Sequence, residues 1–226
     1  MQSIIEFFSN FVQRPDKVIM QMIETYGYWI YAILFTIIFA ETGLIIMTFL
    51  MPFLPGDALI FSIGMIAAND EQNHLHIEFV IPLLMFAAIL GDNVNYFVGK
   101  KFGHWILNQG DSFFLKKKHL EKATDFFNEN GKKAIIIARF MPVVRTIIPF
   151  ICGTTNLNYR IFLTYSMIGA FLWVGVISLL GYFLGGFDIV QHHLEKFIFG
   201  IIIAANLPLI TRLIKAQFNK NKKDAI

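Results

Sequence analysis

The sequence predicts an all-α polytopic membrane protein, with about four transmembrane helices and two oppositely oriented re-entrant helical hairpins that form an inverted repeat. The 226-residue chain is 56% hydrophobic and only 15% charged, and its mean hydropathy is +0.58. Its apolar residues form long runs, and proline and glycine interrupt two of them. So few charged residues exclude an ordinary soluble domain and a disordered chain, and favour a bundle in a bilayer.

The net charge of +3 gives no argument for a nucleic-acid partner, and none is expected. The basic residues are clustered beside apolar runs, which suits the anionic cytoplasmic face of a membrane. The single cysteine, Cys152, excludes an intrachain disulfide and a cysteine-based metal site.

Residues 1–27 are expected to form an N-terminal interfacial helix, because apolar side chains recur there at helical spacing. Residues 28–47 form the first predicted span. They open a membrane domain over residues 28–186, and residues 187–226 supply a last transmembrane helix and a basic cytoplasmic tail.

Two apolar segments are too broken to cross a hydrocarbon core of about 30 Å, which needs around 20 residues of helix. They cover residues 48–68 and 134–155. We expect each to be a re-entrant hairpin that enters and leaves on one side. The residues predicted to break the hairpin helices are Pro55, Gly56, Pro142, Pro149 and Gly153.

The other apolar runs, at residues 77–99, 161–185 and 197–214, are predicted spans. Between the first two lies the basic stretch 100–133. An amphipathic surface helix is predicted within it from the spacing of Phe113, Leu120, Ala123 and Phe127.

Lysine placement predicts the topology, because cytoplasmic loops are enriched in Lys and Arg. Residues 100–133 and both termini are expected in the cytoplasm, and the lysine-free residues 69–78 outside. A hairpin followed by a span then occurs twice, in opposite orientations. Gly64 is expected to correspond to Gly153 in this repeat, and Gly91 to Gly169. Short Pro/Gly-interrupted segments in matching positions indicate a transporter binding site.

Five charged residues fall at or near membrane depth, where a charge costs about 2.5–3.5 kcal/mol on insertion scales. They are Glu41, Asp57, Asp92, Arg139 and Arg145. Their near balance predicts mutual pairing. A break at Pro142 lets the two arginines converge on one anion, and the guanidinium fork suits phosphate. A carboxylate that exchanges an arginine for an apolar surrounding can load and release a proton.

We therefore predict that Arg139 and Arg145 bind a phosphate group, and that Glu41 and Asp57 carry protons or gate the site. Structural alternatives stay open. The arginines can serve only to fix the hairpin, the two carboxylates can be static partners, and Asp57 can cap the helix after Gly56. Asp92 is expected to be polar packing or interfacial.

The leading functional hypothesis from these residues is a transporter for a phosphate-bearing anion. The alternatives are a proton-coupled small-ion antiporter, a lipid-phosphate hydrolase and an assembly factor without transport. A hydrolase is disfavoured because no histidine lies at membrane depth to supply a nucleophile or an acid. We expect no enzyme activity, no cofactor and no metal site.

Two segments carry a family resemblance. Residues 53–57 (Phe-Leu-Pro-Gly-Asp) and 139–146 (Arg-Phe-Met-Pro-Val-Val-Arg-Thr) resemble the signature segments of the DedA family. Pro149, Gly153, the Glu41-Thr42-Gly43 turn and the Gly91-Asp92 … Tyr96 … Gly99 string fit the same pattern, and the resemblance covers about residues 28–186. Asn95 stands where the family has Gly, and Cys152 stands where it has Ala.

The resemblance implies a multi-pass protein of the bacterial inner membrane with two re-entrant hairpins. It implies a transporter, or flippase, for an anionic lipid phosphate. The implied lipid is undecaprenyl phosphate, the recycled lipid carrier of cell-wall synthesis, and its movement is linked to the proton motive force. Glu41, Asp57, Arg139 and Arg145 match the family's functionally important acidic and basic residues. The implied partners are a polyprenyl phosphate and protons, and a homo-oligomer is left open.

Overall fold

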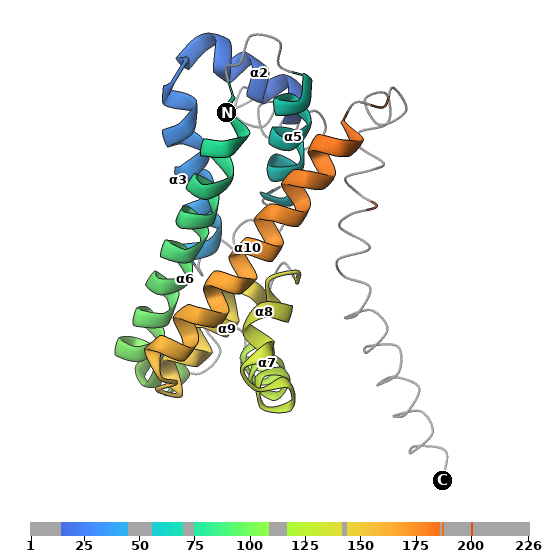
Figure 1. Ribbon diagram of the computed structural model, residues 1–226. Coiled ribbons are helices and arrows are strands. Elements are labelled where there is room, and N and C mark those ends of the chain that lie inside the picture. Colours follow the sequence, from blue (N-terminus) through green and yellow to red (C-terminus); the bar gives the residue numbers. More distant parts are fainter. Residues whose placement is uncertain are drawn as a thin grey trace, which may run out of the picture.

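The computed structural model describes residues 15–44, 56–69, 75–108, 117–141 and 144–185, with residues 187 and 200, and contains no strand within them. Its helices are α2 (Pro15–Tyr26), α3 (Trp29–Gly43), α5 (Gly56–Asn69), α6 (Ile77–Asn108), α7 (Lys117–Asn130), α8 (Lys133–Ala138), α9 (Val144–Thr154) and α10 (Tyr159–Leu184). Figure 1 shows α6 and α10 running the length of the bundle, with α2 at one end and α7 at the other. The all-helical class is therefore confirmed.

Two of the described helices are long and apolar enough to cross a membrane: Ile77–Gly103 with 27 residues and Tyr159–Leu184 with 26 residues. At 1.5 Å per residue each is about 40 Å long. They coincide with the predicted spans at residues 77–99 and 161–185. The predicted span at residues 197–214, apart from residue 200, and residues 1–14 of the proposed N-terminal helix lie outside the described residues.

Helix α3 does not form the full span predicted at residues 28–47. Near its start, the Tyr31 hydroxyl accepts a hydrogen bond from the backbone N–H of His76, at the beginning of α6 (3.2 Å). At its end, a Cβ on Gly43 would lie 2.9 Å from the Cα of Gly91, in the middle of α6. Helix α3 therefore runs parallel to α6 and reaches only halfway along it.

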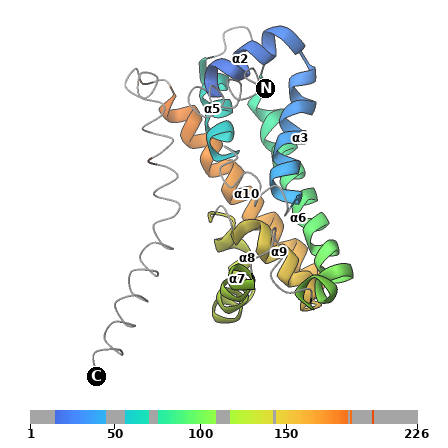
Figure 2. The ribbon, with the colours of Figure 1, turned by 180° about the vertical axis from the view of Figure 1, so that it is seen from behind.

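Helix α5 returns to the end from which α3 starts. It begins at Gly56, against the carboxylate of Glu41, and its later residue Met65 packs against Gly185 at the end of α10. Helices α3 and α5 thus form one helical hairpin (Figure 2), about 20 Å deep for 15 and 14 residues. The turn was predicted inside residues 48–68, but the descending arm is α3. Both arms are apolar throughout, so hydropathy could not separate a half-span from a span.

The second hairpin consists of α8 and α9, and its helices are interrupted at residues 139–141. Pro142 and Pro55 lie outside the described residues, and Gly56 is the first residue of α5. The prediction that Pro149 and Gly153 break this hairpin is wrong, because both lie inside the continuous helix α9. Pro149, the sixth residue of α9, lacks the N–H for one intrahelical hydrogen bond, but the helix continues past it to Thr154.

The two hairpins pack on the two long helices, α6 and α10, in opposite order. Helix α3 packs on α6 and α5 on α10, whereas α8 packs on α10 and α9 on α6. Each short helix meets its long helix through glycines. A Cβ on Gly64 would overlap the carbonyl oxygen of Ser178, and a Cβ on Gly153 would overlap that of Tyr96. The predicted correspondence of Gly64 with Gly153 is therefore confirmed by equivalent contacts.

Reciprocal contacts fix the register of this repeat. On the long helices, Gly99 meets the Phe150 carbonyl and Gly181 meets that of Phe61. Residues that make equivalent contacts differ in number by 89 between α5 and α9, and by 82 between α6 and α10. The predicted match of Gly91 with Gly169 is thus wrong by four residues, about one helical turn. The register pairs Gly91 with Trp173.

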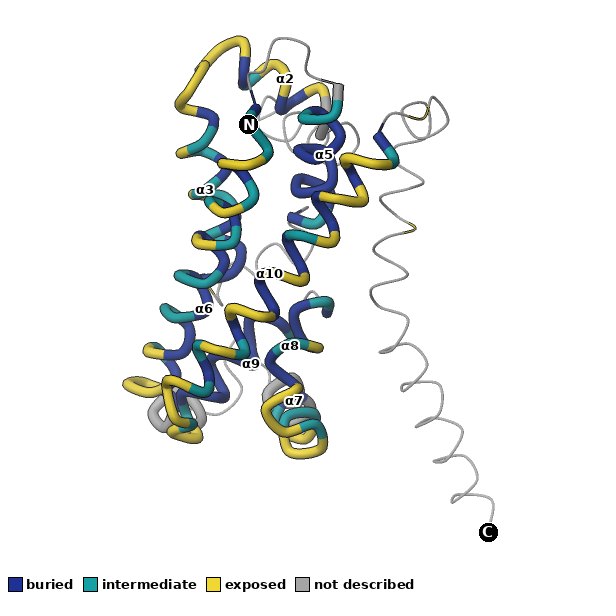
Figure 3. The backbone as a smooth tube through the Cα atoms, viewed as in Figure 1, coloured by how far each residue is buried: buried dark blue, intermediate teal, exposed yellow. Residues whose placement is uncertain are grey.

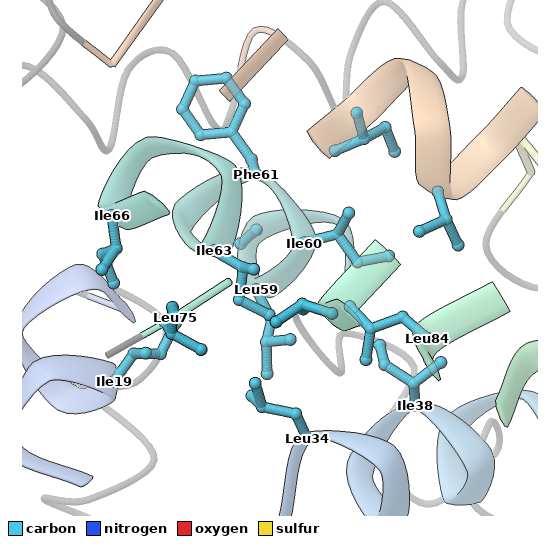
Figure 4. Close-up of a cluster of buried hydrophobic side chains, with 14 of the residues drawn as sticks. Ile19, Leu34, Ile38, Leu59, Ile60, Phe61, Ile63, Ile66, Leu75 and Leu84 are labelled. Carbon is cyan, nitrogen blue, oxygen red and sulfur yellow. The ribbon is translucent and has the colours of Figure 1, made fainter. Parts of the chain in front are cut away.

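Two buried clusters form the core (Figure 3). In the first, α5 is enclosed on all sides: Leu59, Ile60 and Ile63 are fully buried among side chains of α2, α3, α6 and α10, as Figure 4 shows. The second lies at the opposite end, around Tyr96 and Phe162. Helix α7 contributes Ala123 and Phe127 to it, as the predicted amphipathic helix requires; Phe113 and the Leu120 side chain lie outside the described part.

Candidate functional site

The tips of the two hairpins meet in the middle of the bundle, and the five predicted charged residues gather there. Glu41 ends α3 and Asp57 begins α5, whereas Arg139 follows α8 and Arg145 begins α9. One hairpin therefore carries carboxylates at its tip and the other carries guanidinium groups. Asp92 joins them from the middle of α6.

Arg145 bridges the two acidic residues of the first hairpin. It is 8% exposed, its Nη2 forms an ion pair with Glu41 Oε1, and its Nη1 donates to Asp57 Oδ1 at 3.3 Å. Gly56 permits this arrangement, because a Cβ there would overlap the Glu41 carboxylate. Each of the two carboxylates thereby has a cationic partner, as a low-dielectric interior requires, although they share a single guanidinium group.

Arg139 has a separate carboxylate partner. Its Nη2 donates to Asp92 Oδ2 at 2.7 Å and lies 3.4 Å from the carbonyl oxygen of Ala88. The same Asp92 oxygen accepts a hydrogen bond from Ser166 of α10 (2.6 Å). The expectation that Asp92 is interfacial or simple polar packing is wrong, because it forms a buried ion pair.

Trp173 connects the two ion pairs. Its ring centroid lies 5.0 Å from Cζ of Arg145 and 5.7 Å from Cζ of Arg139, within the range of cation–π contacts. Its indole Nε1–H donates to Asp57 Oδ1 at 2.8 Å. Trp173 is fully buried, so these contacts are shielded from solvent.

Neither Trp173 nor Ser166 was predicted from the sequence. Both lie on the face of α10 that also carries Gly169 and Ala170, and this i, i+3, i+4, i+7 pattern follows a helix stripe. Gly169 leaves room for the side chain of Arg139. A polar and a large aromatic residue on a stripe of small residues is a signal that could have identified this face.

Asn95 has a local structural role. Its Nδ2 donates to the carbonyl oxygen of Thr42 (2.7 Å), one residue after Glu41. The last carbonyls of a helix lack intrahelical partners, so this bond satisfies one of them and holds the end of α3 against α6. The other departure from the family pattern, Cys152, is a buried packing residue.

Several buried polar atoms at the centre of the site have unused hydrogen-bonding capacity. Three carboxylates face two guanidinium groups, so the formal charges leave one negative charge uncompensated. Among the described residues, no hydrogen-bond partner is found for Oε2 of Glu41, Nη1 of Arg139 or Nε of Arg145. The arginines therefore retain donors for an anion, and the carboxylates retain capacity for a cation or a proton.

An apolar groove of about 530 Å³ lies outside this cluster, between α3 and α6. Phe39, Leu90, Val94 and Phe97 line it, and Lys101 lies at its end. Within the described part of the chain, no group of three His, Cys, Asp or Glu side chains is arranged to hold a metal ion. The expected absence of a metal site stays a prediction.

Comparison with known proteins identifies the family. Residues 54–183 match the VTT domain. The chain is 40% identical to Protein DedA of Escherichia coli (strain K12) over 212 residues, covering 94% of both chains. It is 36% identical to an uncharacterized membrane protein of Mycobacterium leprae (strain TN) over 77% of this chain and 75% of the relative. Inner membrane protein YqjA of Escherichia coli (strain K12) is 34% identical over 69% and 68%, respectively.

No solved structure gives a significant match. The VTT match contains both arginines, Asp57, Asp92 and Trp173, and the longer alignment with Protein DedA covers nearly the whole chain. The expected resemblance is therefore confirmed, and the chain belongs to the DedA family of VTT-domain membrane proteins.

Proposed function

We propose that this protein is a transporter that moves an anionic lipid phosphate across the bacterial cytoplasmic membrane, without enzymatic chemistry, a cofactor or a metal. The observation that carries the proposal is the pair of buried arginines at the meeting point of two hairpin tips. Undecaprenyl phosphate is the proposed lipid, on the basis of the resemblance to DedA proteins. The relatives' names, which describe bacterial membrane proteins, support the location.

The ion pairs favour a phosphate substrate. A phosphate offers several anionic oxygens, and guanidinium groups bind such oxygens through paired N–H donors. In the structure the carboxylates of Glu41, Asp57 and Asp92 pair with the N–H donors of the two arginines. They hold the positions that phosphate oxygens take in the proposed loaded state, so substrate binding is an exchange of anions.

The uncompensated carboxylate supports coupling to protons. When a phosphate takes the guanidinium groups, Glu41 and Asp57 lose Arg145 as a partner. A carboxylate left without its partner in a low-dielectric site is stabilised by taking up a proton. In this scheme phosphate entry favours protonation, and phosphate release favours loss of the proton.

The apolar groove favours a lipid over a small ion. A polyprenyl chain needs apolar surface close to the site that binds its phosphate. The groove between α3 and α6 provides such surface, and Figure 3 shows exposed residues along the outer face of α10. A small-ion antiporter needs neither feature.

The proposal is tested by reconstituting the full chain in vesicles and measuring movement of a labelled polyprenyl phosphate between leaflets. We expect Arg139→Ala and Arg145→Ala each to lower the rate at least about 100-fold, because a bidentate contact and a buried charge are lost. Arg160→Ala is the matched control, since Arg160 is exposed at the start of α10. Lipid movement that survives both buried substitutions contradicts the proposal.

Two further measurements in the same vesicles separate the alternatives. Glu41→Gln should remove the dependence on an imposed pH gradient, and an unchanged dependence contradicts a coupling role for this residue. Release of inorganic phosphate indicates a hydrolase. Dissipation of the pH gradient by an inorganic ion without added lipid indicates an antiporter.

A further inference from the structure

We infer that Trp173 is a positioning residue that holds Arg139 and Arg145 on one shared ring, so that a single phosphate group can bind both. The inference rests on the proposed function and concerns the same site. Arg139 and Arg145 have different carboxylate partners, and the ring of Trp173 lies within cation–π distance of both guanidinium groups.

The inverted repeat shows that Trp173 departs from the symmetry of the scaffold. The register that pairs Gly99 with Gly181 places Trp173 opposite Gly91. Gly91 packs backbone to backbone against Gly43, so the first repeat closes tightly at this level. The second repeat instead inserts the largest side chain available, and Arg139 lies over it. The second repeat makes its close helix contact one turn earlier, at Gly169, which leaves the position of Trp173 available to a large side chain that contacts both arginines.

The ring limits the separation of the arginines. The guanidinium carbons of Arg145 and Arg139 lie 5.0 and 5.7 Å from the centroid of the same indole ring. An arginine released by its carboxylate keeps a favourable surface on the indole ring, because cation–π attraction is strong in a desolvated site. Trp173 thus keeps both guanidinium groups close to one position during the exchange of anions.

The indole N–H adds a second effect. Asp57 Oδ1 accepts hydrogen bonds from both Trp173 Nε1 and Arg145 Nη1. When a phosphate takes Arg145, Asp57 keeps the bond to Trp173. This bond lowers the penalty of leaving a buried carboxylate without its cation, so it eases the exchange itself.

The direct test uses the fluorescence of Trp173 in the full chain. The sequence has three tryptophans, so Trp29→Phe/Trp105→Phe leaves Trp173 as the only one. Farnesyl phosphate, a short prenyl phosphate, should change its emission saturably, because the guanidinium groups move relative to the ring. Farnesol, which lacks the phosphate, should not. Radiolabelled farnesyl phosphate that binds without any change in emission overturns the inference.

Substitutions at Trp173 separate the two contacts. Trp173→Phe keeps a ring face but loses the N–H, so we expect kcat for lipid movement to fall about tenfold with little change in KM. Trp173→Leu loses both, so KM should also rise about tenfold. Trp29→Phe is the matched control, because Trp29 is exposed at the start of α3.

The outcomes distinguish this inference from the proposed function. If Arg139→Ala and Arg145→Ala abolish transport but Trp173→Leu has wild-type kcat and KM, the inference is wrong and the transporter proposal stands. If neither arginine substitution changes transport, the transporter proposal fails. If Trp173→Leu does not fold, the fluorescence test still decides the question, because the Trp29→Phe/Trp105→Phe variant keeps Trp173.

Discussion

Asp92 is a buried carboxylate in the middle of α6, and one of its oxygens binds both Arg139 and Ser166. A carboxylate in an apolar run is visible at once, and its cost in a membrane predicts a partner. The identity of that partner depends on the long-range packing of α6, α8 and α10, which brings Arg139 and Ser166 to the same oxygen. The same packing creates the Trp173 contacts. The residue types of the site were thus predictable, but their pairing was not.

The Asp92–Arg139 pair gives a stability prediction. Asp92→Asn leaves Arg139 as a buried cation without its carboxylate, which should lower the free energy of unfolding by about 3–5 kcal/mol. Asp92→Asn/Arg139→Gln removes both charges, so it should regain most of that loss. Denaturant titration in detergent measures both variants. A double variant no more stable than Asp92→Asn contradicts a direct charge interaction.

At the scale of elements, the glycine contacts explain how the hairpins are held. Helix α5 meets α10 through Gly64 and Gly181, and α9 meets α6 through Gly153 and Gly99. Small residues allow backbones to approach closely, which is the usual basis of helix packing in membranes. The sequence marked Gly64 and Gly153 as equivalent, but it assigned Gly153 to a helix break. A glycine that lets a neighbouring backbone approach and a glycine that ends a helix look alike in one sequence.

These contacts predict a position-dependent effect of adding one methyl group. Gly64→Ala and Gly153→Ala place a Cβ against a backbone carbonyl oxygen that cannot move alone, so each should cost about 1–3 kcal/mol of stability. Gly175→Ala on α10 is the matched control. Its Cβ would lie 3.7 Å from Cε of Met85, an ordinary contact, and alanine favours the helix by about 1 kcal/mol.

Thermal unfolding of the three variants in the same detergent measures this difference. The expected order of stability is Gly175→Ala above Gly64→Ala and Gly153→Ala. Equal stability of all three contradicts the close approach of the helices. A loss confined to Gly153→Ala contradicts the equivalence of the two hairpins.

At the scale of the whole molecule, the helical class, the two long spans and the gathering of charged residues in the two interrupted segments follow from composition and charge. How far α3 reaches along α6 does not follow from composition and charge. Residues 28–47 are as apolar as a full span, and only the contacts of Tyr31 with His76 and of Gly43 with Gly91 show that the helix stops halfway. The difference matters because it places α2 and the start of α3 at the end of the bundle where α6 begins, opposite to the end that lysine placement predicts.

The two topologies differ in a measurable way. Lysine placement puts the start of α3 on the cytoplasmic side with the basic loop, whereas the structure puts it at the same end as the start of α6. Cys152 is the only native cysteine and is buried, so Cys152→Ala gives a cysteine-free background. Tyr28→Cys, Glu78→Cys and Lys132→Cys then report on exposed positions at the two ends of the bundle.

In intact cells, a membrane-impermeant maleimide should label Tyr28→Cys and Glu78→Cys together, and should label Lys132→Cys only after the membrane is opened. This result follows if α3 and α5 enter from one side as a hairpin and α8 and α9 enter from the other. Labelling of Glu78→Cys alone in intact cells restores α3 as a full span and contradicts the hairpin. In that case the carboxylates and arginines no longer meet as the tips of two opposed hairpins, and the symmetry behind the Trp173 inference is lost as well.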